Sequence, residues 1–564
     1  MTRNPAVLAL ALGLLGAAPT AAAPCKYGKI AELPVTMRGL VPMVPARING
    51  VDAQFILDSG AFYSTLVEAA ADRMKVAPVP GVGMQIRGLG GMAGLLGQNV
   101  LGAADVEYDL ANGAVRMLKP LGDCGGVDLG YWVPGKTGVV TLENAQSLTS
   151  PHTIGEAEVN GRKIRVLFDT GASTSFLSQS AARRVGLRLD AAGAKAGGLS
   201  SGIGSALSES TLAPVESFSI GGETIRNTSL RVGSRDLATM ADMLLGADFF
   251  LSHRILVAKS QRRLYFTYNG GPVFRLDAPP SAATPTVDAA AVPADVAAGT
   301  DADALGRRAA AAAARRDYRT AIAALDRAVE LEPKAVARIR ERAGVRAAAK
   351  DYAGARADFD RVLELAPGDA PALLGRGLTH LAQQAPARAR PDMEAALRAA
   401  PDDPQIVLGA AGGLLAAGDY GEAVALYDRW IAGHRGQERS WSLLNSRCFA
   451  RALWGRELDR ARADCDAALR YGGRSSAVLD SRGLVNLRAG RLKEAVADYD
   501  AALKLQPRLA WSLYGRGWAK RAMGDAAGGA ADMRAGVALD PELPKLVERA
   551  GLDKPAPTPA AQVQ

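Results

Sequence analysis

The 564-residue chain has few of the residues that usually bind metal ions, with only 4 histidines and 4 cysteines. The cysteines lack the spacing of a metal site. No basic run is dense, and the net charge of +9 is small for this length, which argues against a nucleic-acid partner. The sequence therefore predicts no metal and no other cofactor. Each histidine is expected to be a surface or packing residue: His152, His253, His380 and His434.

Long hydrophobic runs are also scarce. The one apolar run that stands out, residues 6–18, is too short to remain in a bilayer as a membrane span. Arg3 before this run and the alanines at 21–23 after it predict a signal peptide at residues 1–23, which is removed on export. The composition, rich in alanine and arginine, points to the bacterial periplasm. We expect no membrane span after signal cleavage.

The four cysteines suit an oxidising compartment. Cys25 and Cys124 bracket the first half of a β-rich region, and Cys448 and Cys465 lie within one predicted helical hairpin, near enough to bridge. Two disulfides are compatible with these positions. The sequence alone does not fix the pairing, and four unpaired cysteines stay an alternative.

A short motif that occurs twice is the most informative feature of the chain. Phe-Ile-Leu-Asp-Ser-Gly-Ala at 55–61 returns as Val-Leu-Phe-Asp-Thr-Gly-Ala at 166–172, and an apolar pair with a glycine follows each copy, at 95–97 and 244–246. Short apolar runs alternate with Gly, Asn and Asp turn signals throughout 26–270, which is typical of strands. A single Asp-Ser-Gly would be interpreted as a turn with a solvated carboxylate. Two copies, each after an apolar strand, predict two related lobes that each present an aspartate.

These elements resemble the aspartic peptidases of the pepsin and retropepsin families. The resemblance covers about residues 30–270 and implies a mainly-β, bilobal acid-protease fold, with lobe 1 at 26–150 and lobe 2 at 151–272. It identifies Asp58 and Asp169 as the catalytic pair. Whether the two lobes pair within one chain or between two chains stays open at this point.

The chemistry of such a pair follows from its charge. Two carboxylates in contact cannot both ionise at low cost, so together they hold one proton and supply one acid and one base. The base takes a proton from a water between them while that water attacks the amide carbon, and the acid donates to the carbonyl oxygen. Ser59 and Thr170 would brace the pair across the lobe interface. Gly60 and Gly171 would let backbone approach the carboxylates where a Cβ would obstruct.

The two lobes differ in length after the aspartate, which bears on activity. In the second lobe, the glycine-rich segment 197–204 is the candidate for a mobile hairpin, or flap, over the substrate, with Gly198, Ser200 and Gly202. The first lobe has about half as much chain between its aspartate and the next glycine signal, and only Gly-Leu-Gly-Gly at 88–91 is left there. The segment around Ser200 also fits a Gly-x-Ser-x-Gly nucleophile elbow, but no apolar strand precedes it, so we interpret it as a loop.

From about residue 301 the sequence becomes helical, with a 34-residue period that resembles the tetratricopeptide repeat. The resemblance implies an all-α solenoid at 301–550 with about seven repeats, after an Ala/Pro linker at 273–300 and before a disordered tail at 551–564. Aligned arginines in the repeats either line a groove for acidic peptides or form a solvated helix face. The residues that recur with this period include Pro333, Pro367 and Pro401, the Asp-Tyr dipeptides that begin at Asp317, Asp351 and Asp419, and Arg342 and Arg376.

Two functions fit the whole sequence. The first is an exported aspartic endopeptidase whose repeats recruit a protein substrate or partner through their concave surface. The second is a scaffold in which the peptidase-like lobes have lost turnover and grip an extended peptide as an added strand. Both aspartates favour the enzyme, whereas the short first lobe favours the scaffold. Carboxylates far apart in space would exclude the enzyme.

Overall fold

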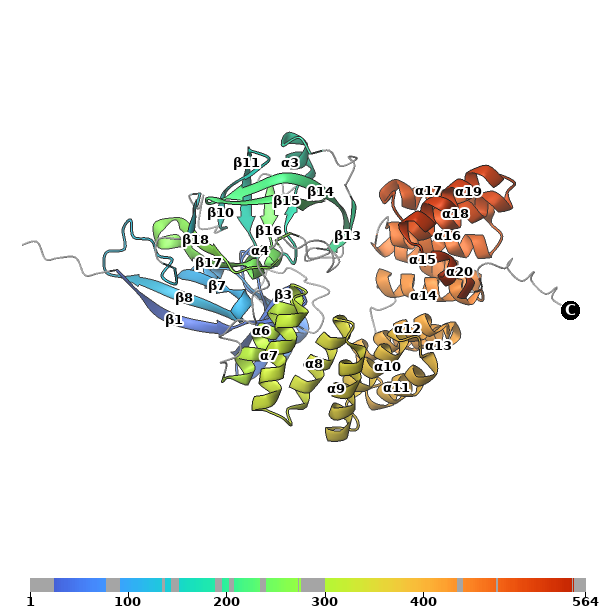
Figure 1. Cartoon of the computed structure of the whole chain (residues 1–564), viewed down its shortest axis with the longest axis horizontal. Coiled ribbons are helices and arrows are strands. Elements are labelled where there is room, and N and C mark those ends of the chain that lie inside the picture. Colours follow the sequence, from blue (N-terminus) through green and yellow to red (C-terminus); the bar gives the residue numbers. More distant parts are fainter. Residues whose placement is uncertain are drawn as a thin grey trace, which may run out of the picture.

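The structure, a computed structural model, describes residues 25–77, 92–133, 137–143, 152–187, 195–201, 207–233, 240–271, 273–274, 300–433, 440–472, 475–549 and 551. A β-rich region up to residue 274 is followed by a run of helices, which is the predicted fold class (Figure 1). Several predicted features lie outside the described residues: the signal peptide 1–23, linker residues 275–299, the tail beyond 551, the glycines of 88–91, Gly202 and His434.

The first of three sheets belongs to lobe 1 and has the strand order β2-β3-β4-β6-β5. Its β3–β4 hairpin turns at Asn49 and Gly50, whose φ angles of 50° and 81° are the left-handed values that these residue types tolerate. β4 then runs parallel to β6, so that Ile56 pairs with Leu95. The elements of this lobe are β2 (Thr36–Arg38), β3 (Val41–Ile48), β4 (Val51–Leu57), β5 (Thr65–Leu66), α1 (Glu68–Arg73), β6 (Gly94–Leu96) and α2 (Gln98–Leu101).

The second sheet repeats this plan in lobe 2 and extends it. Its order is β10-β11-β16-β12-β15-β14-β13, with a hairpin at Asn160 and Gly161 and a parallel pairing of Leu167 with Leu244. The strands β13 to β15 have no counterpart among the described residues of lobe 1. The elements are β10 (Ile154–Val159), β11 (Arg162–Phe168), β12 (Phe176–Leu177), α3 (Gln179–Arg184), β13 (Lys195–Ser201), β14 (Leu207–Ile220), β15 (Glu223–Gly233), β16 (Met243–Leu245) and α4 (Ala247–Ser252).

The third sheet joins the two lobes within one chain, in the order β1-β8-β7-β17-β18-β9. Strands β7 and β17 pair across the lobe boundary, with Tyr108 opposite Ile255. The lobes therefore share a sheet and one hydrophobic core rather than meeting as separate units. Its elements are β1 (Lys26–Pro34), β7 (Asp105–Asp109), η1 (Leu110–Asn112), β8 (Ala114–Leu121), β9 (Gly138–Thr141), β17 (His253–Ala258), η2 (Lys259–Gln261) and β18 (Arg263–Tyr268).

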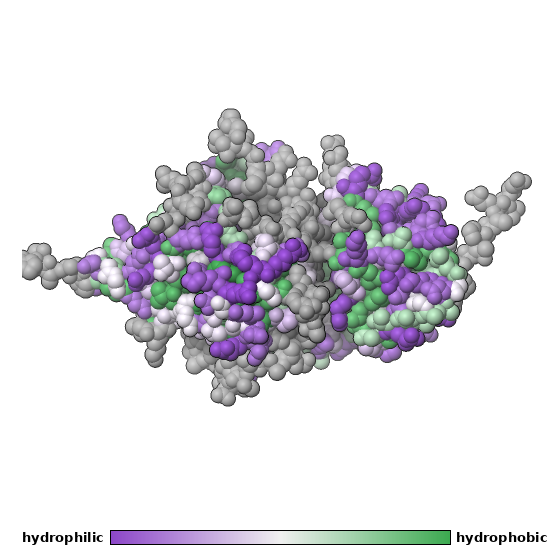
Figure 2. All heavy atoms as spheres, turned by 90° about the horizontal axis from the view of Figure 1, so that it is seen from above, coloured by the Kyte–Doolittle hydropathy of each residue, from purple (hydrophilic) through white to green (hydrophobic). Residues whose placement is uncertain are grey.

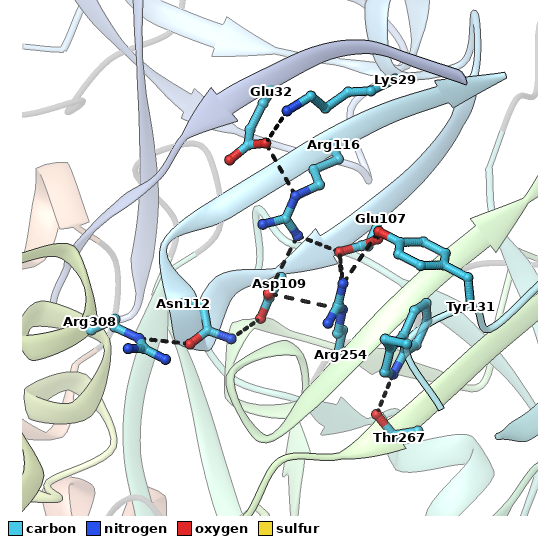
Figure 3. Close-up of polar contacts among 11 residues, drawn as sticks. Lys29, Glu32, Glu107, Asp109, Asn112, Arg116, Tyr131, Arg254, Thr267 and Arg308 are labelled. Atoms are coloured by element: carbon cyan, nitrogen blue, oxygen red, sulfur yellow. Dashed lines mark hydrogen bonds and ion pairs between the residues drawn. The ribbon is translucent and has the colours of Figure 1, made fainter. Parts of the chain in front are cut away.

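A polar network on this shared sheet centres on Glu107, whose side chain is fully buried (Figure 3). Its carboxylate accepts from Arg116 of β8 at 2.5 Å, from Arg254 of β17 at 2.8 Å and from the Tyr131 hydroxyl. Arg254 also lies over the ring of Trp132, 4.6 Å from its centroid. A buried charge is tolerated only when it is paired in this way, so the network fixes the register of strands from both lobes.

Helices α6 to α19 form antiparallel hairpins that stack along an arc, and α20 follows them (Figure 1). The phased residues set this period. Asp317 and Asp351 cap helices by accepting from the backbone N–H of Thr320 and Gly354. The helices are α6 (Ala302–Ala314), α7 (Tyr318–Leu331), α8 (Val336–Ala348), α9 (Tyr352–Leu365), α10 (Ala370–Ala382), α11 (Pro386–Ala399), α12 (Pro404–Ala417), α13 (Tyr420–Gly433), α14 (Trp441–Trp454), α15 (Leu458–Gly472), α16 (Ser476–Arg488), α17 (Leu492–Leu505), α18 (Ala510–Ala522), α19 (Ala526–Leu539) and α20 (Leu543–Arg549).

The aligned arginines form a ladder of ion pairs inside the solenoid. Arg376 of α10 forks onto Asp392 of the next helix at 2.6 and 2.8 Å and reaches Asp360 of the preceding hairpin at 2.7 Å. This finding corrects both interpretations of the arginines, because each guanidinium is bound between two aspartates and is largely shielded from solvent. The same arrangement recurs at Arg342, Arg447, Arg482 and Arg516.

The first helix of the solenoid packs directly on the β-rich region. Ala311 of α6 belongs to the core shared by the two lobes. Arg308 donates to Asn112 of η1 at 2.9 Å, which continues the polar network of the shared sheet (Figure 3). Arg315 donates to the carbonyls of Leu251 and Gly270. The repeats are thus docked on the lobes at their N-terminal end.

Two disulfides are present. One joins Cys25, before β1, to Cys124, after β8, and the other joins Cys448 of α14 to Cys465 of α15, the facing helices that the sequence predicted. Among the described residues, no helix combines the length and apolar character needed to cross a membrane.

Candidate active site

The two aspartates of the repeated motif stand at equivalent strand ends. Asp58 follows β4 and Asp169 follows β11, and the backbone N–H of each donates to the last residue of the neighbouring parallel strand, Leu96 at 3.0 Å and Leu245 at 2.9 Å. The apolar residues before each aspartate bury the strand, and the apolar-apolar-glycine segments supply the strand beside it. The repeat in the sequence is therefore a repeat in space.

The residues after the aspartates lock the two loops together. The Ser59 N–H donates to Thr170 Oγ1 and the Thr170 N–H donates to Ser59 Oγ, both at 2.9 Å. Each hydroxyl then donates across the interface, Ser59 to the Phe168 carbonyl at 3.1 Å and Thr170 to the Leu57 carbonyl at 2.8 Å. These four buried bonds fix the separation and orientation of the loops that carry the carboxylates.

The glycines allow each loop to touch the opposite carboxylate. A Cβ on Gly60 would overlap the carboxyl group of Asp169, and a Cβ on Gly171 would overlap that of Asp58. The structure therefore brings Asp58 and Asp169 close enough for each carboxyl group to act on the other. Any larger residue at either glycine would push the carboxylates apart.

Burial sets the electrostatics of the pair. Asp58 is only 3% exposed, and burial together with the charge of Asp169 raises the pKa of Asp58 to about 7. Burial also raises the pKa of Asp169. Backbone donors oppose these shifts, since the N–H of Ala61 donates to Asp58 at 2.8 Å and that of Gly171 to Asp169 at 2.8 Å. The two carboxyls titrate as a coupled pair that keeps one proton near neutral pH.

In each lobe a serine hydroxyl makes two further hydrogen bonds that support the loop. The side chains that accept from these serines were not predicted from the sequence. Ser64 and Ser175 occupy equivalent positions, each four residues after the glycine of its Asp-Ser/Thr-Gly motif. Ser175 donates through its hydroxyl to Asp248 at 2.6 Å, whereas Ser64 donates to Asn99 at 2.8 Å. Both serine hydroxyls also accept from the glycine of the nearby motif. Asp248 and Asn99 each lie two residues after the glycine of the apolar-apolar-glycine segment, but they differ in residue type and were not predicted. Their common distance from that glycine is the signal that could have revealed them.

His152 lies closer to the site than the sequence suggested. Its Nε2 is 3.0 Å from the Gly60 carbonyl, and its ring packs edge-on against Phe62 at 4.2 Å between centroids. It thus contacts the loop that carries Asp58. The other described histidines lie elsewhere, and the described residues contain no group of three or more His, Cys, Asp or Glu placed to hold a metal ion.

The candidate flap forms part of an antiparallel hairpin. Gly198 and Ser200 lie on β13, opposite Ser210 and Ser208 of β14. Gly202 and the rest of the hairpin tip lie outside the described residues. The β13–β14 hairpin is at the edge of the lobe 2 sheet, and the structure leaves its role untested.

Comparison with protein families agrees with this geometry. A family model described as aspartyl protease matches residues 44–100 and 155–249, which contain both aspartates. Two models described as tetratricopeptide repeat match 307–370 and 380–446. The chain carries an aspartyl-protease-like domain followed by tetratricopeptide repeats. The match covers the paired loops of both lobes and includes the β13–β14 hairpin.

Solved structures similar to the chain are tetratricopeptide repeat proteins. One from Parabacteroides merdae is 19% identical and covers 39% of this chain and 84% of its own, with a TM-score of 0.31. YrrB, described as having an unusual peptide-binding site, is 18% identical over 34% of this chain and 97% of its own, with a TM-score of 0.29. PilF of Pseudomonas aeruginosa is 15% identical over 39% of this chain and 99% of its own, with a TM-score of 0.30. Among curated proteins, no sequence matches at a significant level.

Proposed function

We propose that the chain is an aspartic endopeptidase that hydrolyses peptide bonds with a water held between Asp58 and Asp169. The observation that carries this proposal is the contact between the two carboxyls, each pressed against the glycine of the opposite loop. Raised pKa values leave one proton on the pair at a pH where isolated aspartates would have lost theirs. The pair thus offers one acid and one base at the same place.

The proposed reaction uses this single proton. The ionised carboxyl takes a proton from the water as the water oxygen attacks the amide carbon, and the protonated carboxyl donates to the carbonyl oxygen. Collapse of the tetrahedral intermediate breaks the C–N bond. The pair donates the proton it took from water to the departing amine and takes one back from a hydroxyl of the intermediate, so it again holds one proton. The bonds between Ser59 and Thr170 hold both carboxyls in place through these steps.

We further propose that the protein is exported and that its repeats recruit a protein substrate or partner. The predicted signal peptide and the disulfides of the two domains support export. Tetratricopeptide repeats offer an extended surface for protein segments. Because α6 is docked on the lobes, a protein bound by the repeats would be held at high effective concentration near the aspartates.

A peptide-binding scaffold without turnover is the second candidate. The short lobe 1, in which the described residues contain no counterpart of β13 to β15, favours it. In this function the lobes would grip an extended peptide as an added strand, and the paired carboxyls would be a remnant.

Digestion of a peptide library separates the two candidates. We expect the wild-type chain to cleave library peptides, Asp169→Asn to cleave none detectably, and Asp52→Asn to cleave as the wild type does. Asp52 is the matched control because it is a carboxylate of lobe 1 in an exposed pair with Arg47. Binding without cleavage by the wild type would favour the scaffold. Cleavage that persists in Asp169→Asn would mean that the pair is not its source.

A further inference from the structure

The last described helix, α20, does not continue the solenoid. A further repeat would place its first helix closely beside α18 and α19, but α20 has little contact with α19. Its apolar side chains instead lie in a cluster with residues of α14 and α16, the first helices of preceding hairpins, and side chains of α18 pack against the same cluster (Figure 1). Its Leu543 and Val547 join the hydrophobic cluster of Leu444 in α14 and Leu484 in α16.

The surface that α20 covers is rich in aromatic side chains. Trp511, Tyr514 and Trp518 of α18 are partly buried against the same cluster as Leu543 and Val547. Apolar residues form a band over this C-terminal part of the solenoid (Figure 2). A small cavity of about 10 Å³ lies beside α20, lined by Phe449, Asp480, Leu487, Tyr499, Trp511 and Val547 among others. First helices of successive repeats line the concave side of such solenoids, so this aromatic groove is a surface of the kind that binds protein segments.

Few side chains of α20 are buried against this groove. Of the α20 side chains whose burial is described, only Leu543 and Val547, one helical turn apart, are buried. Leu546 is half-buried, and Pro544, Lys545 and Glu548 are exposed. Beyond the helix, Arg488 reaches the Gly551 carbonyl at 3.4 Å. Apolar side chains at positions i and i+4 are among the anchors by which an amphipathic helix binds a groove. A helix with few such anchors buries little apolar surface, so a competing helix with the same anchors could replace it.

We propose that α20 is an internal occupant of a protein-binding groove, and that a partner displaces it with an amphipathic helix carrying apolar residues four positions apart. This inference rests on the proposed recruitment of a protein by the repeats and adds the partner's chemistry and its regulation. Because α20 and the partner compete for the groove, the apparent affinity for the partner equals its intrinsic affinity multiplied by the fraction of molecules whose groove is open. The chain would thus limit its own recruitment of partners.

Binding of a fluorescent peptide with the sequence of residues 541–551 tests this inference. The receiving chain is full-length and carries Asp169→Asn in every case, so that the peptide is not cleaved. We expect a chain with Leu543→Ser and Val547→Ser to bind the peptide at least tenfold more tightly than a chain with the native α20. Lys545→Ser is the matched control, because Lys545 is exposed on the same helix, and it should bind as weakly as the native sequence.

Three results would overturn the inference. One is equal binding by the native and double-serine chains, and another is equal binding of a peptide that itself lacks the two apolar residues. The third is a dimer of the native chain that the double substitution abolishes, because α20 would then occupy a second copy. Hydrogen exchange of the native chain gives an independent check: amides of α20 should exchange faster than those of α18, and equal protection would contradict displacement. None of these readouts depends on proteolysis, so a failed peptidase proposal leaves them interpretable.

Discussion

At the residue scale, the site depends on keeping one proton between two buried carboxyls. Asp58 and Asp169 are held in contact by backbone, since each faces a glycine that leaves no space for a side chain. Burial and mutual repulsion raise the pKa of Asp58 to about 7. Isolated, solvated aspartates would both be ionised at neutral pH and would offer no acid to the leaving amide.

The pH dependence of cleavage follows from this pair. As the pH rises through about 7, the pair loses its shared proton and with it the general acid, so kcat/KM should fall. At low pH the second carboxyl becomes protonated and the base is lost, which gives a bell-shaped profile. Measurement of kcat/KM between pH 3 and 9 (roughly the range spanned by the two titrations) checks this expectation. A rate that keeps rising above neutral pH would contradict it.

Asp248 gives a second prediction, this one for stability. Its pKa is raised to about 6 by burial, so the folded chain binds this proton more tightly than the unfolded chain does. The stability gained from that proton is full below pH 3.8 and is lost as the pH rises through 6. An asparagine does not titrate, so the unfolding free energy of wild type relative to Asp248→Asn should fall by about 3 kcal/mol across this window.

The two lobes supply the control for this substitution. Asn99 accepts from Ser64 in lobe 1 as Asp248 accepts from Ser175 in lobe 2, so an amide is expected to fit. Asp248→Ala should show the same change with pH relative to wild type, because alanine does not titrate either. It should also be about 1–3 kcal/mol less stable than Asp248→Asn at every pH, because it leaves buried donors unpaired. Urea denaturation at several pH values measures both variants. An unchanged pH dependence in Asp248→Asn would show that Asp248 does not titrate in this range.

The sequence predicted the aspartates and their neighbours well, because both copies of the motif kept the same residue types. Ser59 and Thr170 were expected to brace the loops, and they exchange hydrogen bonds. Asp248 was not found, because its counterpart in lobe 1, two residues after the same motif glycine, is an asparagine. His152 was set aside as a surface or packing residue, since nothing in a single sequence places it beside Gly60.

At the scale of elements, regular features of the sequence correspond to regular features of the repeats. Asp317 and Asp351 start helices as N-caps, and prolines such as Pro333 follow the helix ends. Ala321 and Ala355 are fully buried where helices approach closely. The arginine ladder was not foreseen, because the aspartates that bind each arginine lie on other helices, whose packing the sequence alone does not specify. For Arg376 they lie 16 residues before and 16 after it.

This ladder predicts unequal effects for two similar arginines. Arg376→Met leaves Asp392 largely buried without its forked partner, so we expect a loss of about 3 kcal/mol in unfolding free energy. Arg361→Met is the matched control, because Arg361 of α9 forms an exposed pair with Glu364 of the same helix. This substitution should cost less than about 0.5 kcal/mol. Urea denaturation followed by far-UV circular dichroism compares them. Equal losses would show that the ladder adds nothing beyond a surface ion pair.

At the scale of the whole molecule, long-range pairing joins parts that the sequence presents as separate. The division into two lobes and a repeat region followed from the duplicated motif and the 34-residue period. The six-stranded sheet shared by the lobes did not, because β1, β7 and β8 pair with β17 and β18 without any repeated motif to connect them. The position of α20 was also hidden, since its apolar pattern suits the first helix of another repeat.

The docking of α6 makes the molecule a single assembly of lobes and repeats. Its Ala311 lies in the core of the lobes, and Arg308 extends the polar network of the shared sheet. Under the proposed function, a protein captured by the repeats would therefore be held close to the sheet that both lobes share. By competing for the groove, α20 would regulate that capture.

The most direct measurement of the central claim is a double-mutant cycle on peptide cleavage. On a peptide identified from the library and below pH 7, kcat/KM is compared for wild type, Asp58→Asn, Asp169→Asn and the double variant. Because the carboxyls act as one unit, we predict that each single variant loses at least about a thousandfold and that the double variant loses little more. A single variant that retains a tenth of the activity, or losses that multiply in the double variant, would contradict a shared proton between Asp58 and Asp169.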